Sequence, residues 1–211
     1  MEARSTDIYQ SISHPSEGLY RERGSRFIAL AFPIRDEAEI SPILDDIRRK
    51  YHDARHHCYA WRLGIAGEPY RVNDDGEPSG SAGRPIHGQM LSMELSDVLV
   101  VVVRYFGGVK LGVSGLINAY RQATREALNN STVCTRELRS RFELDFAYPR
   151  MNDVMRFIRE EGLDIESNDF AENCRVVASA RNGNAERIKK RAAAIYGMEC
   201  RLAGAFVYDP K

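Results

Sequence analysis

Hydrophobic positions in the first part of the chain follow two different periods. Apolar runs at residues 25–33 and 58–65 are bounded by turn-forming residues and predict buried strands. The unbroken apolar run at residues 98–103 predicts a central strand covered on both faces. Apolar residues at helical spacing, and one short returning strand, complete the pattern. The expected helices lie at about residues 41–51 (or from a turn earlier, near Asp36), 86–96 and 116–129, and the short strand lies at residues 70–72.

The remainder of the chain follows a second plan. The elements expected there are a strand at residues 142–148, a helix at 151–161, strands at 164–170 and 175–180, a helix at 185–196 and a strand at 200–208. This order, βαββαβ, is that of the ferredoxin-like split βαβ motif. We therefore expect an α+β protein with two domains, at residues 25–131 and 140–211. Residues 1–24 are polar and are expected to form a lead-in, with a linker at residues 132–139.

Composition narrows the classes of function. The chain carries 30 basic and 30 acidic residues, so its formal net charge is zero. The charges divide evenly, with 16 basic and 17 acidic residues before residue 136 and 14 and 13 from there on. Neither half is a basic module, which argues against tight binding to duplex DNA. A local basic patch remains open, because a sum over residues says nothing about position.

Cysteine usage and hydropathy indicate a cytosolic protein. Four cysteines stand far apart without a CxxC pair, which predicts reduced thiols and neither a metal set nor a disulfide scaffold. No apolar run approaches the roughly 20 residues that a membrane span needs. The polar N-terminus has no apolar segment typical of a secretory signal.

Glycine is concentrated in two loops, each of which precedes a predicted helix. The glycines are Gly76, Gly80, Gly83, Gly107, Gly108, Gly112 and Gly115. Helix N-termini leave backbone N–H groups unpaired, so both loops are candidate anion sites. Lys110 favours the second loop, where Ser114 could cap the helix and also contact a phosphate. Alternatively, these glycines only form tight turns.

Charged residues in and beside these loops allow more than one interpretation. Asp74, Asp75 and Glu77 are weak candidates for holding a divalent cation through oxygen ligands. They could equally meet arginines of a partner, or cap turns. Arg104 and Tyr105 close the central strand, where ligands often bind, although Arg104 could instead pair with one of the three acids.

Two other polar segments have a simpler explanation. His56 and Cys58 share one face of a predicted strand, and packing explains them better than a metal site or a nucleophile with its base. The basic run at residues 187–191 is interpreted as a solvated helix face rather than an RNA contact.

Long motifs in these segments resemble the IMPACT/YigZ family. They are Ser25-Arg26-Phe27-Ile28, Ala54 with His56 or His57 and Cys58, Asp74 to Gly80, Ala82 to Ile86, Arg104 to Gly112, and Gly115-Leu116 through Ala119-Tyr120. The resemblance covers about residues 25–130, and the tail resembles the second domain of bacterial members. Ser81 and Ser114 stand where the family pattern has threonine and glycine.

The resemblance has implications for fold and function. It implies a first domain of the βαβ type shared by a ribosomal protein and the GHMP kinases. It also implies a second domain similar to the C-terminal domain of elongation factor G. Eukaryotic relatives regulate translation by competing for the activator of a kinase, using an additional N-terminal domain for which this chain is too short. That partner is therefore not carried over, and the resemblance supplies no catalytic residues.

The leading hypothesis is a non-enzymatic binding or regulatory protein linked to translation or RNA. It would contact a protein, RNA or nucleotide partner through the two glycine-rich loops and require no cofactor. A ribosome-associated partner is included among these alternatives. The expected ligand-binding residues are Asp74, Asp75, Glu77, Ser79, Arg104, Tyr105, Lys110 and Ser114. The alternative is an enzyme acting on a phosphorylated small molecule with a divalent metal at the acidic loop. Oligomeric state stays open, as does a purely structural role for the two loops.

Overall fold

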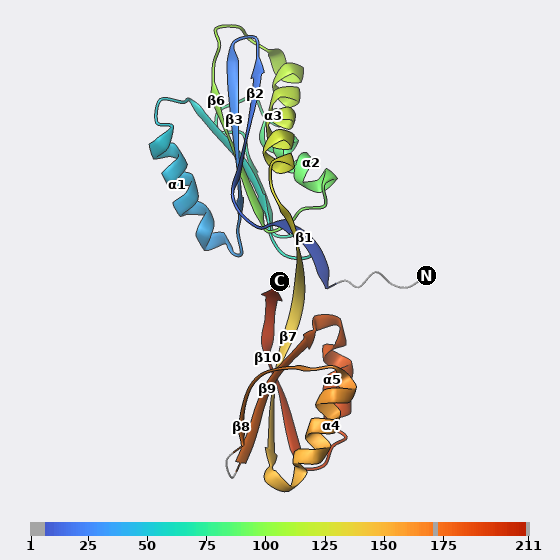
Figure 1. Cartoon of the computed structure of the whole chain (residues 1–211). Helices are drawn as coiled ribbons and strands as arrows, with labels where there is room; N and C mark the ends of the chain where they lie inside the picture. Colours follow the sequence, from blue (N-terminus) through green and yellow to red (C-terminus); the bar gives the residue numbers. More distant parts are fainter. Residues whose placement is uncertain (1–6, 171–172, 210–211) are drawn as a thin grey trace, which may run out of the picture. The chain divides into compact units, whose positions relative to one another are not determined.

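The computed structural model describes residues 7–170 and 173–209, which form two compact units. The first unit is Tyr9–Thr135, and the second consists of the described residues from 136 onward together with residues 7 and 8. Each unit has its own sheet and helices (Figure 1). The expectation of an α+β protein with two domains is confirmed.

The first unit is built on an antiparallel sheet of five strands. In spatial order the strands are β2 (Ser16–Glu22), β3 (Ser25–Pro33), β6 (Val98–Tyr105), β4 (His56–Arg62) and β5 (Tyr70–Asn73). The order places β6 in the middle of the sheet, and its register sets His56 opposite Arg104. Residues far apart in sequence therefore meet at the end of β6.

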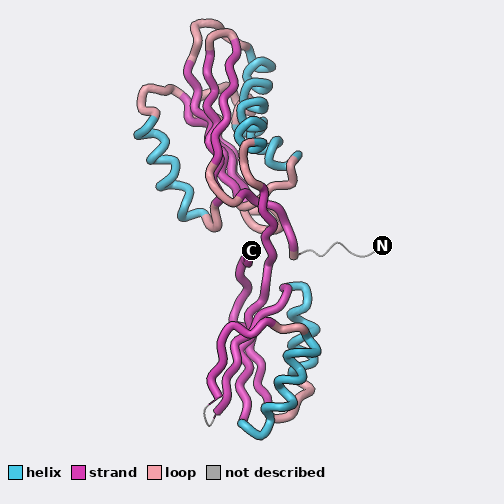
Figure 2. Tube along the Cα trace, in the orientation of Figure 1, coloured by secondary structure: helices cyan, strands magenta, loops and turns pink. Residues whose placement is uncertain are grey.

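Helices cover both faces of this sheet, as Figure 2 shows. Helix α1 (Ile40–Lys50) packs on one face, while α2 (Gly83–Ser92) and α3 (Gly112–Asn129) pack on the other. The side chains of β6 divide between the two cores. Val98, Val100 and Val102 face α2 and α3, and Leu99, Val101 and Val103 face α1. This alternation explains the unbroken apolar run in the sequence, because each face of the strand is buried.

The second unit has one helix-covered sheet face. Its elements are β7 (Val133–Ala147), α4 (Met151–Glu161), β8 (Asp164–Phe170), β9 (Asn173–Arg181), α5 (Ala185–Ala192) and β10 (Met198–Tyr208). The strands pair in the order β10-β7-β9-β8, all antiparallel, and β1 (Ile8–Ile12) adds to β7. Alternate residues of β7, such as Phe142 and Leu144, pack beneath α4 and α5. The opposite face carries arginine–carboxylate pairs, such as Arg175 with Asp145.

Two segments differ from the expectation. Residues 8–22 contain β1 and β2, where a polar lead-in was expected, and residues 133–139 belong to β7, where a linker was expected. Residues 1–6 of that lead-in lie outside the described residues. A two-residue turn at Arg23-Gly24, with φ of 46° and 79°, joins β2 to β3. Polar residues conceal both strands in the sequence. Strand β1 pairs with the distant β7, whereas β2 is an edge strand that pairs with the neighbouring β3.

Helix ends also shift from the expected positions. Helix α2 begins at Gly83 and ends at Ser92, because Glu94, with φ of 54°, turns the chain out of the helix. Leu95 lies beyond the helix but is fully buried, and its apolar character is the reason why the predicted helix extended too far. Helix α5 likewise ends at Ala192. Within the described residues, no helix combines the length and apolar character needed to cross a membrane.

Strand β2 lies against α3 through a close backbone approach at Gly18. A Cβ atom at this position would lie 2.2 Å from the backbone nitrogen of Ala127. We expect Gly18→Ala to destabilise the first unit by about 1–3 kcal/mol, because backbone atoms cannot move aside as a flexible side chain can. Urea unfolding followed by Trp61 fluorescence measures this change, since the single tryptophan lies in the core of the first unit.

The matched control is Gly88→Ala in α2, where an added Cβ meets nothing within 4 Å. Alanine is the better helix former, so this variant is expected to gain about 0.5–1 kcal/mol. Equal unfolding midpoints for the two variants would show that β2 does not need the close approach.

Candidate functional site

A cleft of about 870 Å³ lies in the first unit, where β4 and β6 meet the start of α3. Four of the expected site residues line it: Glu77, Arg104, Tyr105 and Lys110. The other lining residues are Asp53, Ala54, Arg55, His56, Pro78, Phe106, Leu111, Gly112, Val113 and Leu116. The cleft therefore combines charged, aromatic and aliphatic side chains, and the first helical turn of α3 forms part of its boundary.

Arg104 is a buried cation at the end of β6. Only 7% of its surface is exposed, because strand alternation turns it toward the face that α2 and α3 cover. Its Nη1 donates to Oε1 of Glu77 at 2.5 Å, and its guanidinium lies over the rings of Phe27 and Phe106. Its Nε is buried and has no hydrogen-bond partner among the described residues. Of the two alternatives for Arg104, pairing with an acid is therefore observed.

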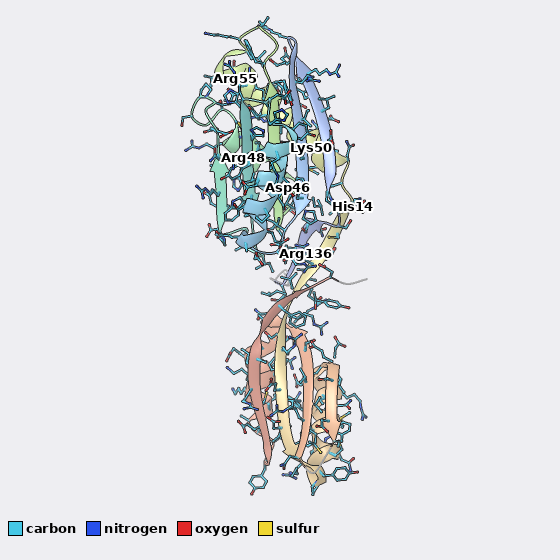
Figure 3. All side chains as sticks on the ribbon, turned by 90° about the vertical axis from the view of Figure 1, so that its left-hand side faces the viewer. His14, Asp46, Arg48, Lys50, Arg55 and Arg136 are labelled. Carbon is cyan, nitrogen blue, oxygen red and sulfur yellow. The ribbon has the colours of Figure 1, made fainter. Side chains whose placement is uncertain are left out.

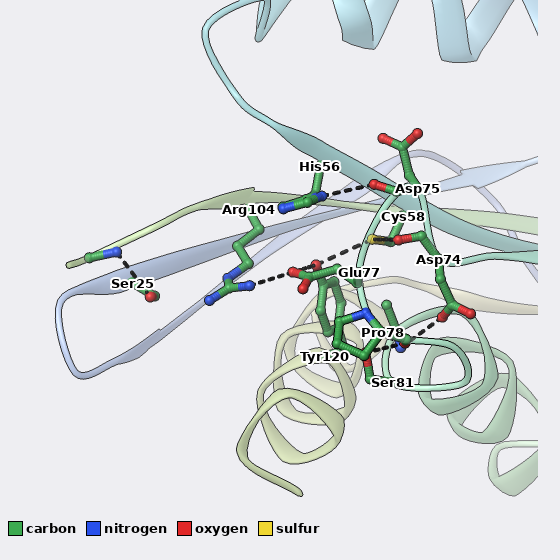
Figure 4. A network of polar contacts seen from close by, with 12 residues as sticks. Ser25, His56, Cys58, Asp74, Asp75, Glu77, Pro78, Ser81, Arg104 and Tyr120 are labelled. Atoms are coloured by element: carbon green, nitrogen blue, oxygen red, sulfur yellow. Dashed lines mark hydrogen bonds and ion pairs between the residues drawn. The ribbon is translucent and has the colours of Figure 1, made fainter. Parts of the chain in front are cut away.

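Glu77 links Arg104 to a network of buried polar side chains that includes Tyr120 and Cys58 (Figure 4). The Tyr120 hydroxyl donates to Oε1 of Glu77 at 2.8 Å. The Cys58 thiol lies 3.0 Å from the carbonyl oxygen of Asp74 and 3.2 Å from the Tyr120 oxygen. Burial raises the pKa of the Cys58 thiol and that of Tyr120 far above their usual ranges. Cys58 therefore stays a protonated donor, which agrees with packing and argues against a nucleophile.

Asp74 holds its own loop together. Its Oδ1 accepts from the backbone amides of Ala82 and Gly83, and its Oδ2 accepts from the amide of Gly80. Two of these amides lie at the start of α2, whose N-terminus favours a negative charge. Asp74 is thus committed to internal hydrogen bonds, and it does not line the cleft.

The ionisation of Asp74 reflects this environment. Partial burial acts to raise the pKa of the carboxyl, but the amides of Gly80, Gly83 and Ala82, together with Arg84, lower it overall. The charged form is therefore the one that stabilises the fold.

Asp75 also serves the scaffold. Its Oδ2 accepts from the backbone amide of His57 at 2.7 Å, and its carbonyl oxygen accepts from Nδ1 of His56 at 2.8 Å. With a proton on Nδ1, the neutral His56 ring keeps Nε2 as an acceptor. His56 lines the cleft, whereas Asp75 only orients it.

The carboxylates of the three acids do not converge on one point in the first unit. Each accepts hydrogen bonds from groups of the first unit, and they separate between the loop and the cleft. Within the described residues, no three histidine, cysteine, aspartate or glutamate side chains gather as metal ligands.

Lys110 and the start of α3 form the most open part of the cleft. Lys110 is exposed, and α3 begins at Gly112, whose φ of 72° turns the chain into the helix. Leu111 is the N-cap and provides no side-chain cap, so the expected capping by Ser114 is wrong. The helix begins earlier than predicted, which places Ser114 inside the first turn. Ser114 and Ser79 are exposed and lie outside the lining residues.

Tyr105 and Asp53 form a pair at the rim of the cleft. The Tyr105 hydroxyl donates to Oδ1 of Asp53 at 2.7 Å, and the Arg26 guanidinium lies 4.7 Å from the ring centroid. This hydrogen bond lowers the pKa of Asp53 and raises that of Tyr105. Both side chains are thereby fixed, with Asp53 charged.

Sequence patterns missed Arg55 and Phe106 as lining residues. Arg55 directly precedes β4, and Figure 3 labels it in the same view as Arg48 and Lys50 of α1. Phe106 follows β6 and is 56% exposed. The pairing of β4 with β6 sets His56 opposite Arg104, so Arg55 and Phe106, just beyond this pair, reach the same end of the sheet. Their spacing in the sequence does not reveal this. An aromatic residue between Arg104-Tyr105 and two glycines was the available signal for Phe106.

Comparison with known proteins matches the region that carries the cleft. The family model described as the Impact N-terminal domain matches residues 23–128. The chain is similar to the IMPACT family member YvyE of Bacillus subtilis, with 34% identity over 149 residues, which is 71% of this chain and 69% of that protein. It is also similar to the IMPACT family member YigZ of Escherichia coli, with 30% identity over 148 residues, which is 69% of this chain and 72% of that protein.

Of two further similar proteins, one matches a smaller part of the chain and the other has a lower sequence identity. A protein IMPACT homolog of Saccharomyces cerevisiae is 33% identical over 95 residues, which is 43% of this chain and 36% of that protein. A crystal structure of a hypothetical protein has the same fold, with a TM-score of 0.66 at 23% identity, and the match covers 92% of this chain and 96% of that one.

The commitment of Asp74 to backbone amides predicts a pH-dependent contribution to stability. Its folded-state pKa is lowered, so its contribution is present above the unfolded-state pKa of about 4 and is lost as pH falls through the folded-state value. We expect Asp74→Asn to be less stable than the wild type by about 1–2 kcal/mol at pH 7. The difference should shrink as pH falls below about 4 and through the lowered pKa of Asp74. Urea unfolding of both proteins at pH 7 and at successively lower pH measures it.

Ser79→Ala is the control, since Ser79 is exposed in the same loop. It should stay within about 0.5 kcal/mol of the wild type at every pH. A stability difference for Asp74→Asn that does not vary with pH would contradict the assigned role of the carboxylate.

Proposed function

This chain belongs to the IMPACT family, and we propose that it is a non-enzymatic regulatory protein linked to translation that binds single-stranded RNA in the cleft. The observation that carries the proposal is the juxtaposition of cations with the exposed ring of Phe106. Cationic grooves with aromatic rings on which bases stack are typical of single-strand binding.

Charge at the cleft favours an anionic ligand. Arg55, Arg104 and Lys110 line it, against two carboxylates, Asp53 and Glu77. Glu77 already accepts hydrogen bonds from two donors, and Asp53 accepts one from Tyr105. The remaining positive charge is local, which agrees with a net charge of zero for the whole chain.

The exposed ring favours RNA over an acidic protein segment. Phe106 is followed by Gly107 and Gly108, so no side chains flank it on that side. Val109 and Val113 beside the cleft are about half exposed, at 48% and 52%. An apolar surface next to cations suits the alternating bases and phosphates of an unpaired strand. Duplex DNA would need a broader basic surface.

The link to translation also draws on the type of each domain. We propose that the domain at residues 25–131 is of the ribosomal-protein and GHMP-kinase type. We further propose that the domain at residues 140–211 is ferredoxin-like and related to the C-terminal domain of elongation factor G. The order β10-β7-β9-β8 with two helices on one face supports the ferredoxin-like assignment. The regulatory part of the proposal draws on the family resemblance, which extends to the yeast protein named as an IMPACT homolog.

The alternative is an enzyme that uses a metal at the acidic loop and acts on a phosphorylated substrate. The geometry gives it no specific support, because Asp74 and Asp75 accept backbone hydrogen bonds and Glu77 neutralises Arg104. A metal there would have to replace these donors.

We expect Phe106→Ala to weaken binding to an unstructured oligoribonucleotide by about 5- to 100-fold, because one stacking platform is lost. Lys110→Ala should weaken binding by about 3- to 10-fold and reduce the salt dependence by roughly 0.7 in the log–log slope. Fluorescence anisotropy titrations at several salt concentrations measure both changes. Both side chains are exposed, so the fold should be unaffected.

Leu91→Ala and Lys190→Ala are the matched controls, because these residues are exposed on α2 and α5 and do not line the cleft. Neither should change the Kd. If Lys190→Ala weakens binding and Lys110→Ala does not, the interface lies on the basic run of α5 and the cleft assignment is wrong.

A further inference from the structure

Arg104 has one guanidinium N–H group that the described residues leave without a hydrogen-bond partner. Its side chain is 93% buried, yet Nε has no partner among residues 7–170 and 173–209. Buried donors almost always have partners, so an isolated one requires an explanation. A bound group that supplies an acceptor is one, because Arg104 lines the cleft.

The shape of the guanidinium restricts that group. Glu77 occupies Nη1, on one side of the plane. Nε and Nη2 form a separate edge with two parallel N–H directions, which matches two oxygens of a phosphate or carboxylate. A group that binds at this edge would therefore be an oxyanion.

The start of α3 adds hydrogen-bond donors that also favour an anion. Gly112 and Val113 line the cleft, and α3 is an 18-residue helix without a side-chain cap. Its first backbone N–H groups lack intrahelical partners, and Lys110 stands just before them. A phosphate at the Arg104 edge would have this helix terminus and Lys110 in the same cleft.

The burial of Arg104 favours a phosphate at the end of an RNA strand over a phosphodiester in the middle of the strand. On the Nη1 side of the guanidinium, Glu77 and the fully buried Tyr120 continue the polar network into the interior (Figure 4). A phosphodiester within a strand carries a nucleoside on each side, whereas a terminal phosphate is attached on one side only. It also carries about −1.5 to −2 charge near pH 7, with three terminal oxygens.

We propose that the cleft binds the phosphorylated end of an RNA strand, with the terminal phosphate monoester at the Nε–Nη2 edge of Arg104. This inference rests on the proposed function, since it assumes that RNA enters the cleft. Phe106, at the outer part of the same cleft, would then stack on the base next to that end.

The test compares three oligoribonucleotides of one sequence, with a 5′-phosphate, a 3′-phosphate or hydroxyl groups at both ends. Anisotropy with an internal dye measures each Kd. We expect one phosphorylated strand to bind at least about tenfold more tightly than the hydroxyl strand, on the order of one charge-assisted hydrogen bond. The preference should decline below about pH 6, as the monoester gains its second proton.

Variants connect the preference to the residues. Arg104→Lys keeps a cation but lacks the fork, so the ratio of the two Kd values should fall to near one. Because Arg104 is buried, a second variant is needed, and Lys110→Ala should also reduce the ratio. Lys190→Ala should leave it unchanged. Inorganic phosphate at millimolar concentration should compete with the phosphorylated strand.

The outcomes separate the two proposals. If no strand binds, the proposed function fails and this inference fails with it. If all three strands bind equally, RNA binding stands and the terminal-phosphate site is overturned. A preference that survives in both Arg104→Lys and Lys110→Ala also overturns it, because the phosphate then binds elsewhere.

Discussion

The first unit depends on one buried ion pair, between Arg104 and Glu77. A guanidinium so far removed from water is tolerated only with a charged partner and further hydrogen bonds. Glu77 supplies the charge, and Tyr120 supplies a second donor to the same carboxylate. The pair thereby joins the end of β6, the acidic loop and α3. These three elements form the cleft, so its shape is maintained by the same interaction that gives it a cation.

The acidic loop, which contains Asp74, Asp75 and Glu77, looks like a cation-binding motif, but its side chains hold the protein's own structure together. Three carboxylates within four positions suggest a cation site, yet each is used to fix backbone or side-chain groups of the protein. Asp74 holds the start of α2, and Asp75 orients the start of β4. The loop is polar because it replaces regular backbone pairing with side-chain acceptors. Its chemistry is directed inward, and the outward-facing chemistry belongs to residues 104–113.

Sequence patterns predicted most of the fold, and four of the eight expected ligand-binding residues line the cleft. Runs such as residues 98–103 and the helical spacing in α4 are local signals, and those elements appear near the expected bounds. Strand β1 was missed because its partner β7 lies far along the chain, and β2 was missed because polar side chains interrupt the apolar pattern of this edge strand. Arg104 and Lys110 could be found from their place in a motif. Arg55 could not, because only the pairing of β4 with β6 brings it to the cleft.

The continuous strand β7 has an evolutionary consequence. A flexible connector between two domains tolerates insertions and deletions, because no strand register or packing depends on its length. Here residues 133–147 form one paired strand, in which side chains alternate between opposite faces. Adding or removing a single residue would exchange the two faces along everything that follows. Segment length at this junction should therefore be as constrained among relatives as the residues of a buried core, although its composition looks like that of a linker.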